Sequence, residues 1–191
     1  MSLTIIRKPM LVSKYVVIDH FDRTAQTGLG VAETGQAWTN DSNTHGIFAG
    51  GIAGPDGLLT ALVSLPAVAN FDTEVKIRVA DAGVAELRFR ISDNSNYIIA
   101  GIDNRVGETD FEMWKSNAGV FTNLIDYNVA PVLSKWHLIR VLAVESILTM
   151  YVDGALAGSV TETFNQTATR IGFYTASSTE SRYNDLLVRR V

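Results

Sequence analysis

The sequence predicts an all-β protein, an antiparallel two-sheet jelly-roll sandwich. Three observations predict this fold class. Short apolar runs recur at a spacing of about 8 to 12 residues, clusters of Gly, Asn, Asp and Ser separate them, and no long window carries the apolar stripe of an amphipathic helix. A chain of 191 residues can also bury one substantial core. We therefore expect one sandwich domain over residues 15–191, preceded by an extended arm over residues 1–14.

The first strands are predicted from alternation in residues 72–79 (DTEVKIRV) and 85–92 (AELRFRIS). Apolar and charged side chains alternate in both segments, which is the period of two expected of a strand with one buried face. The inward side chains are then Val75, Ile77, Val79, Leu87, Phe89 and Ile91, and the outward ones are Glu74, Lys76, Arg78, Glu86, Arg88 and Arg90. The short segment 81–83 predicts a hairpin turn between the two strands.

The remaining strands are predicted from apolar runs that lie between clusters of turn-forming residues. The first three such runs continue the antiparallel meander, at residues 97–102, 109–114 and 119–125. Five more keep the rhythm of a sandwich, at residues 136–145, 147–152, 155–160, 170–175 and 184–191.

The pair Asp153-Gly154 predicts a two-residue hairpin turn, because both central residues of such a turn need a positive φ. The apolar side chains on its two strands are Leu148, Met150, Val152, Leu156 and Val160. A structural role for Asp153 is favoured, with a metal or ligand contact at the rim of the sandwich as the alternative.

The composition argues against several partners. The formal net charge is −4 and the basic residues are scattered, whereas phosphate binding needs clustered Lys and Arg. Because the chain has no cysteine, disulfides, thiolate zinc sites and thiol nucleophiles are excluded. No apolar stretch has the length of a signal peptide or a transmembrane span. We expect no nucleic acid and no membrane as a partner.

Two segments near the C-terminus resemble a known family. Residues 135–160 (KWHLIRVLAVESILTMYVDGALAGSV) resemble concanavalin A-like domains of the laminin G type, in which Trp-His opens a strand and a later Tyr-Val-Asp-Gly closes a hairpin. Residues 170–191 (RIGFYTASSTESRYNDLLVRRV) are similar to the last two strands of that family. The resemblance implies a concanavalin A-like jelly roll over most of residues 15–191.

A second resemblance lies near the N-terminus. Residues 19–39 (DHFDRTAQTGLGVAETGQAWT) are similar to the opening of jelly-roll domains found in bacteriophage virion proteins of the head surface, tail or fibre. Phe21 and Trp38 are predicted to be core anchors around a glycine-rich excursion that contains Gly28, Gly30 and Gly35. This resemblance implies a component of a phage particle.

No catalytic residue is expected. The concanavalin-like fold includes glycoside hydrolases, whose paired carboxylates lie along one strand face. The nearest match is Asp110, Glu112 and Trp114, which alternate on one strand, but a third acid at the family's spacing is missing. The three histidines, His20, His45 and His137, have no partner at the spacing of metal ligands.

No cofactor and no metal site are expected either. The glycine-rich segment 46–57 (GIFAGGIAGPDG) lacks the Gly-Lys-Ser/Thr ending of a phosphate-binding loop. Asp93-Asn94 and Asp103-Asn104 offer oxygen ligands of the kind that calcium uses in some relatives, but turn formation is the favoured role for both pairs.

Glycan binding needs an aromatic side chain beside polar groups. The candidates for such a platform are Tyr97, Trp114 and Tyr127, although packing in the core or at the rim is the favoured interpretation of each.

The N-terminal arm is apolar, with Ile5, Ile6, Met10 and Leu11 around Pro9. It would add a strand to its own sheet or cross to a neighbouring copy and hold an oligomer together. A homo-oligomer is expected, with a trimer favoured.

The leading functional hypothesis is a non-enzymatic bacteriophage virion structural protein. It would act as a capsid decoration (cement) protein or as a tail or fibre component on the virion surface, assembled in the host cytoplasm. Its partners would be other virion proteins and glycans of the host surface. The alternative is a lectin-like carbohydrate-binding module, and a glycoside hydrolase is a distant third.

Overall fold

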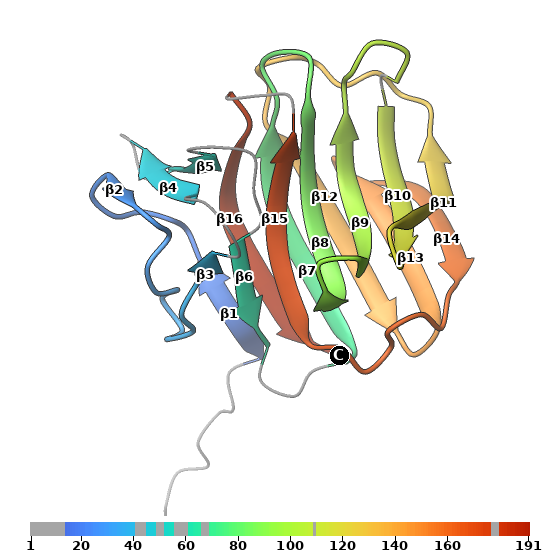
Figure 1. Ribbon diagram of the computed structural model, residues 1–191, viewed down its shortest axis with the longest axis horizontal. Helices are drawn as coiled ribbons and strands as arrows, with labels where there is room; N and C mark the ends of the chain where they lie inside the picture. The colour runs from blue at the N-terminus through green and yellow to red at the C-terminus, as the bar shows by residue number, and fades with distance from the viewer. Residues whose placement is uncertain are drawn as a thin grey trace, which may run out of the picture.

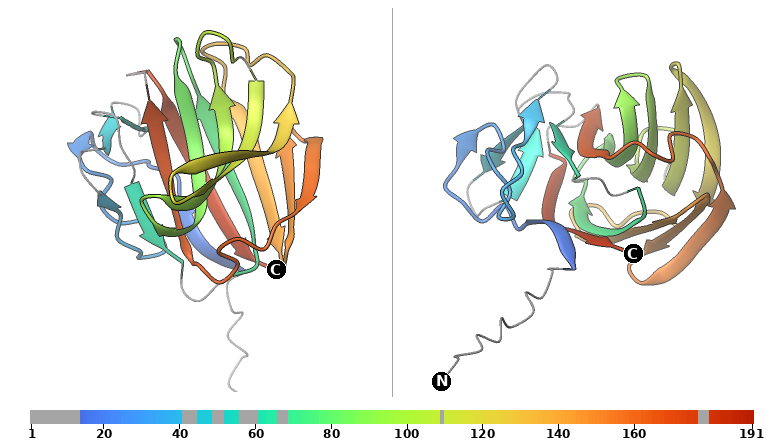
Figure 2. Two further views of the ribbon diagram at one scale, coloured as in Figure 1. Left: turned by 45° about the vertical axis from the view of Figure 1, so that its right-hand side comes forward. Right: turned by 90° about the horizontal axis from the view of Figure 1, so that it is seen from below.

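The computed structural model is a sandwich of two antiparallel β-sheets (Figure 1; Figure 2 shows the two layers from below). The structure describes residues 14–40, 45–48, 52–55, 61–65, 69–108, 110–176 and 180–191. All the secondary-structure elements that these residues form are strands. No helix long and apolar enough to cross a membrane is present among them. The prediction of an all-β two-sheet jelly roll is therefore confirmed.

Within the described part of the chain, one sheet contains nine strands. Its order is β14 (Ala155–Thr161), β13 (Ile147–Val152), β12 (His137–Val144), β7 (Phe71–Arg78), β16 (Arg182–Arg190), β5 (Ile52–Pro55), β4 (His45–Phe48) and β2 (Gln26–Thr27), with β1 (Tyr15–Asp19) also paired to β16. The other sheet contains seven strands. Its order is β11 (Val120–Tyr127), β10 (Asp110–Asn117), β9 (Asn96–Asp103), β8 (Val84–Asp93), β15 (Arg170–Ala176), β6 (Ala61–Ser64) and β3 (Thr39–Asn40).

The core lies between the sheets. It includes a stack of aromatic rings that joins residues near the N-terminus to β15 and β16. Phe21 and Trp38 are buried, with ring centroids 5.8 Å apart. The Trp38 ring stacks on Phe173 at 5.2 Å, and Phe173 stacks on Tyr183 at 4.3 Å. The predicted anchors are therefore confirmed, and the glycines between them have positive φ, as the excursion requires: Gly28, Gly30 and Gly35.

The hairpin predicted at residues 81–83 is wrong. The segment leads from β7 in the nine-stranded sheet to β8 in the seven-stranded sheet, so it connects the two layers. Alternation shows that both strands bury one face, but strands facing each other across a core alternate in the same way as strands paired in one sheet.

The orientation predicted for Arg90 and Ile91 is also wrong. A register irregularity lies between Phe89 and Asp93, and Arg90 has a φ of 50°. This bulge reverses the alternation, so Ile91 joins an apolar cluster with Tyr97 and Ile99. Arg90 is fully buried and donates hydrogen bonds to the backbone carbonyls of Glu162 and Glu145, which flank strands of the other sheet.

The predicted turn at Asp153 is confirmed. Asp153 and Gly154 have φ values of 50° and 85° and connect β13 to β14. The Asp153 carboxylate accepts hydrogen bonds from the Leu138 amide at 2.8 Å and from Nδ1 of the buried His137 at 2.9 Å. The amide of Val132 donates to the other ring nitrogen of His137 at 3.2 Å. The side chains of Asp153 and His137 therefore hold together the β13–β14 turn, the start of β12 and the segment at Val132.

The arm residues Ile5, Ile6, Met10 and Leu11 lie outside the described residues. Their role in assembly, and the boundary of the domain at residue 15, stay predictions.

Candidate functional site

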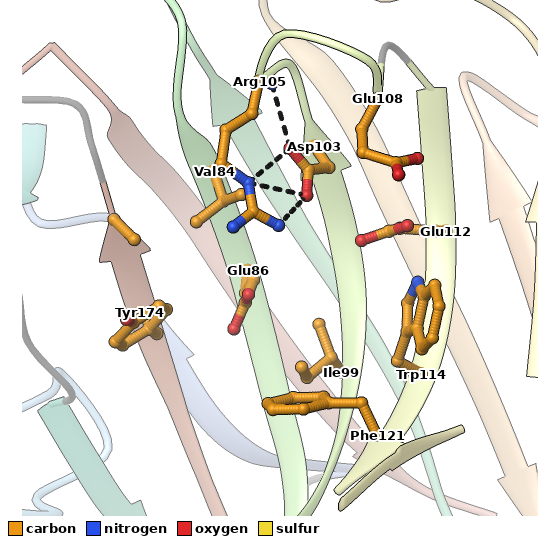
Figure 3. Close-up of a pocket in the computed structure, with 11 residues that line it drawn as sticks. Val84, Glu86, Ile99, Asp103, Arg105, Glu108, Glu112, Trp114, Phe121 and Tyr174 are labelled. Atoms are coloured by element: carbon orange, nitrogen blue, oxygen red, sulfur yellow. Dashed lines mark hydrogen bonds and ion pairs between the residues drawn. The ribbon is translucent and has the colours of Figure 1, made fainter. Parts of the chain in front are cut away.

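The outer face of the seven-stranded sheet contains a hollow of about 320 Å³ (Figure 3). Its walls come from β8, β9, β10, β11, β15 and the loop that follows β9. The lining residues are Val84, Glu86, Ile99, Asp103, Arg105, Glu108, Glu112, Trp114, Phe121, Tyr174 and Ala176.

The strand register explains why the sheet is hollowed here. Gly101 on β9 pairs with Glu86 of β8 on one side and with Glu112 of β10 on the other. Side chains of paired residues lie on the same face of a sheet. The two glutamates therefore flank a position from which no side chain projects, since β8 approaches Gly101 closely.

One wall is held by an arginine between two tyrosine rings. The Arg88 guanidinium carbon lies 4.1 Å from the Tyr97 ring centroid and 3.7 Å from that of Tyr174. Nε of Arg88 donates to the Glu86 carboxylate at 2.9 Å, and Arg88 is only 7% exposed. Stacking and ion pairing together fix these four side chains before a ligand arrives.

The opposite wall is aromatic, with Trp114 partly buried and Phe121 exposed. Trp114 of β10 and Phe121 of β11 both border the hollow, and Phe121 is 53% exposed. An irregularity between Met113 and Trp114 changes the register of β10 and β11. Phe121 is therefore displaced from the position that simple alternation along β11 would suggest.

The carboxyl groups of the hollow differ in their partners. Glu86 is paired with Arg88, and Asp103 accepts two hydrogen bonds of 3.0 Å from Nε of Arg105. Among the described residues, no ion pair joins a cation to Glu108 or Glu112.

Burial, which is the largest cause, and the negative charges of Asp103, Asp110 and Glu86 together raise the pKa of Glu112 to about 7, although the nearby Trp114 N–H opposes the shift. Burial also raises the pKa of Glu86, even though Arg88 opposes it. A carboxyl group with a pKa near 7 can donate or accept a hydrogen bond at neutral pH.

Glu112 is expected to make stability depend on pH. Its pKa rises from 4.5 to about 7 on folding, so stability falls as the pH rises through this interval, because the folded state holds a proton that the unfolded chain releases. Glu112→Gln should therefore increase the free energy of unfolding by about 1 kcal/mol at pH 8, a value reduced for partial exposure, and leave it unchanged near pH 4. Urea unfolding at both pH values tests this, and equal differences at the two would contradict it.

The three residues predicted as a glycan platform do not all lie at the hollow. Trp114 lines the hollow, and Tyr97 lies on the same face but beneath Arg88, where it is 6% exposed. Tyr127 packs on the core side of β11 against Phe111, with ring centroids 6.5 Å apart. The fold thus brings Tyr97 and Trp114 together and keeps Tyr127 apart from them.

Eight lining residues were not predicted as part of a binding site: Val84, Glu86, Ile99, Arg105, Glu108, Phe121, Tyr174 and Ala176. Tyr174 belongs to β15, which lies far from β8 in the sequence and beside it in the sheet. The exposed aromatic Phe121 is the one of these that a search for outward-facing rings could have found.

The acidic pairs considered for calcium form local contacts. Asp93 accepts hydrogen bonds from the Ser95 amide at 2.9 Å and from the Asn96 side chain at 2.8 Å. Asn104 donates to the Asp81 carbonyl at 3.0 Å. Within the described part of the chain, no group of three or more His, Cys, Asp and Glu side chains is arranged to hold a metal ion.

No protein-family model matches the sequence, and no curated protein matches it. Among solved structures, the chain is similar to the carbohydrate-binding module CBM66 from Bacillus subtilis, with a TM-score of 0.67, 19% identity, and coverage of 80% of this chain and 94% of that one. It is also similar to a galectin from Caenorhabditis elegans, with a TM-score of 0.54, 10% identity, and coverage of 72% and 94%.

A third similar structure is domain 4 of an extracellular arabinanase from Geobacillus stearothermophilus, solved in complex with arabinotriose. It has a TM-score of 0.53 and 10% identity, and the match covers 93% of this chain and 92% of that one. At these identities the likeness shows the fold alone. The chain has the jelly-roll β-sandwich fold that these carbohydrate-associated proteins share.

Proposed function

We propose that the protein is a carbohydrate-binding module and that the hollow on the seven-stranded sheet is its glycan site. The observation that carries the proposal is the combination of a partly exposed aromatic wall with fixed polar groups in one hollow of about 320 Å³. The similar structures described above support this lectin-like alternative over the virion role expected from the sequence. No specific observation in the described residues favours the virion role, so it is not carried forward.

A sugar ring has an apolar C–H face and a rim of hydroxyl groups, and the hollow offers a surface for each. Trp114 and Phe121 would pack against the apolar face. The carboxyl groups of Glu108 and Glu112 would accept hydrogen bonds from hydroxyl groups. Because Arg88 and its two stacked tyrosines are already fixed, little conformational entropy would be lost on that side when a ligand binds.

We propose binding without hydrolysis. Two of the four carboxyl groups, those of Glu86 and Asp103, are held by Arg88 and Arg105. A carboxylate whose oxygens are engaged by a guanidinium is not free to contact a sugar as an acid or a nucleophile. The arrangement therefore suits recognition better than the acid and nucleophile roles of a glycosidase.

Trp114→Ala is expected to weaken glycan binding by about tenfold or more, because the truncation removes the aromatic surface of the platform. The measurement is a glycan array with neutral, amino and acidic saccharides, followed by titration of the saccharides that bind. Trp136→Ala is the matched control, since Trp136 lies before β12 of the other sheet and stacks with Arg78. Wild-type protein that binds no glycan, or Trp114→Ala protein that binds as wild type does, would refute the proposal.

A further inference from the structure

The charges of the hollow do not balance. Arg88 forms an ion pair with Glu86, and Arg105 forms one with Asp103. The two remaining acids that line the hollow are Glu108 and Glu112, and no ion pair joins either of them to a cation among the described residues, although the charge of Arg105 acts on Glu112 at longer range. Figure 3 shows both carboxyl groups in the upper part of the hollow, together with the Asp103–Arg105 pair.

The groups facing Glu112 from the neighbouring elements are mostly acidic. They are Glu86 on β8, Asp103 on β9, Arg105 and Glu108 on the loop after β9, Asp110 on β10 itself, and Asp126, which pairs with Glu112 from β11. Three of these acids, Glu86, Asp103 and Asp110, make the ionised form of Glu112 less favourable. A ligand that brought a positive charge would relieve this repulsion and stabilise the ionised carboxylate.

A negatively charged ligand would meet the opposite situation. A uronate carboxylate in the hollow would face Glu108 and Glu112, and like charges at short range are mutually destabilising. The cation that lines the hollow, Arg105, already forms its ion pair with Asp103. A neutral sugar lies between these cases, because its hydroxyl groups can donate to the carboxylates without adding charge.

We propose that the hollow selects saccharides that carry a free amino group, with the ammonium bound by the carboxylates of Glu108 and Glu112. This inference rests on the proposed function, since it names the class of glycan that the same site takes. A charge-assisted hydrogen bond from an ammonium to a carboxylate is roughly twice as strong as a neutral one. Glucosamine and galactosamine units are the simplest saccharides of this class.

The test uses saccharides that differ at one or two substituents. Glucose, glucosamine, N-acetylglucosamine and glucuronate are titrated at pH 7 into the full chain, with the galactose series in parallel, and binding is followed by NMR chemical shifts. We expect glucosamine or galactosamine to bind about tenfold more tightly than its neutral parent, and the uronates to bind least. In the double variant Glu108→Gln, Glu112→Gln, this advantage should disappear, so that the amino sugar binds no more tightly than its neutral parent.

A second double variant, Asp22→Asn with Glu145→Gln, separates specific contact from general attraction. It changes the net charge by the same amount, but neither residue lines the hollow, so the preference for the amino sugar should be retained. Equal binding of amino and neutral sugars, or a preference that survives in the Glu108, Glu112 double variant, would overturn the inference and leave the proposed function standing. If no saccharide of the panel or the array binds, both are overturned.

Discussion

Gly101→Ala is expected to lower the free energy of unfolding by about 3 kcal/mol or more, which is the upper range for an added methyl group in a packed site. A Cβ atom at this position would lie 2.2 Å from the carbonyl oxygen of Ala85 and 2.9 Å from Cα of Glu86. Both are backbone atoms of the neighbouring strand, so no rotation of a side chain can relieve the overlap. Strands β8 and β9 would have to separate at the floor of the hollow.

Urea unfolding measures this effect, and Gly158→Ala is the matched control. At Gly158 the nearest atoms to a new Cβ belong to the side chain of Ile125, at 2.9 Å and beyond. A side chain can move where a backbone cannot, so the control should lose clearly less stability. A Gly101→Ala protein within about 1 kcal/mol of wild type would show that the two strands can adjust.

Asp19→Ala is the second change with a large expected effect. The Asp19 carboxylate is fully buried and accepts hydrogen bonds from the Phe21 amide at 2.8 Å, from both terminal nitrogens of Arg23 at 2.8 Å, and from Nε1 of Trp38 at 2.7 Å. Its removal leaves a partly buried guanidinium without its counter-charge and a buried indole N–H without an acceptor. Breaking such a pair costs about 3 to 5 kcal/mol.

Thermal or urea unfolding of Asp19→Ala tests this, with Asp22→Asn as the control. Asp22 is an exposed acid in the same connection, and surface substitutions of this kind change stability by less than about 0.5 kcal/mol. Tryptophan fluorescence adds a local readout, because the environment of Trp38 should change only in Asp19→Ala. Equal stabilities of the two variants would mean that the buried carboxylate contributes little.

The fold was predictable because the alternation of apolar and polar residues along a strand indicates which of its faces is buried. Residues 72–79 alternate over a full strand, and the Asp153-Gly154 turn needs a backbone conformation that few other residue pairs adopt. The spacing of Phe21 and Trp38 likewise predicted packing and was confirmed as packing. That same motif suggested a virion component, but two aromatic anchors and three glycines specify a core and leave the biological setting open.

The parts that were not predictable depend on which strand lies beside which. The segment 81–83 connects two sheets, and the bulge at Arg90 turns Ile91 to the outer face. Trp114 could be proposed as a platform from alternation alone. Its neighbours in the hollow include Tyr174, which reaches this face only because β15 pairs with β8. Pairing between strands distant in sequence is set by the whole core, so a local pattern does not contain it.

The order of the strands also has a consequence for synthesis on the ribosome. Every described strand before residue 70 joins the rest of its sheet through β15 or β16, which follow all the other described strands in the sequence. At a translation rate of about 5 to 20 residues per second, the early strands wait for roughly 5 to 35 s before the strands that they pair with are made. A nascent chain is therefore most exposed to aggregation, and most dependent on chaperones, just before β15 and β16 emerge.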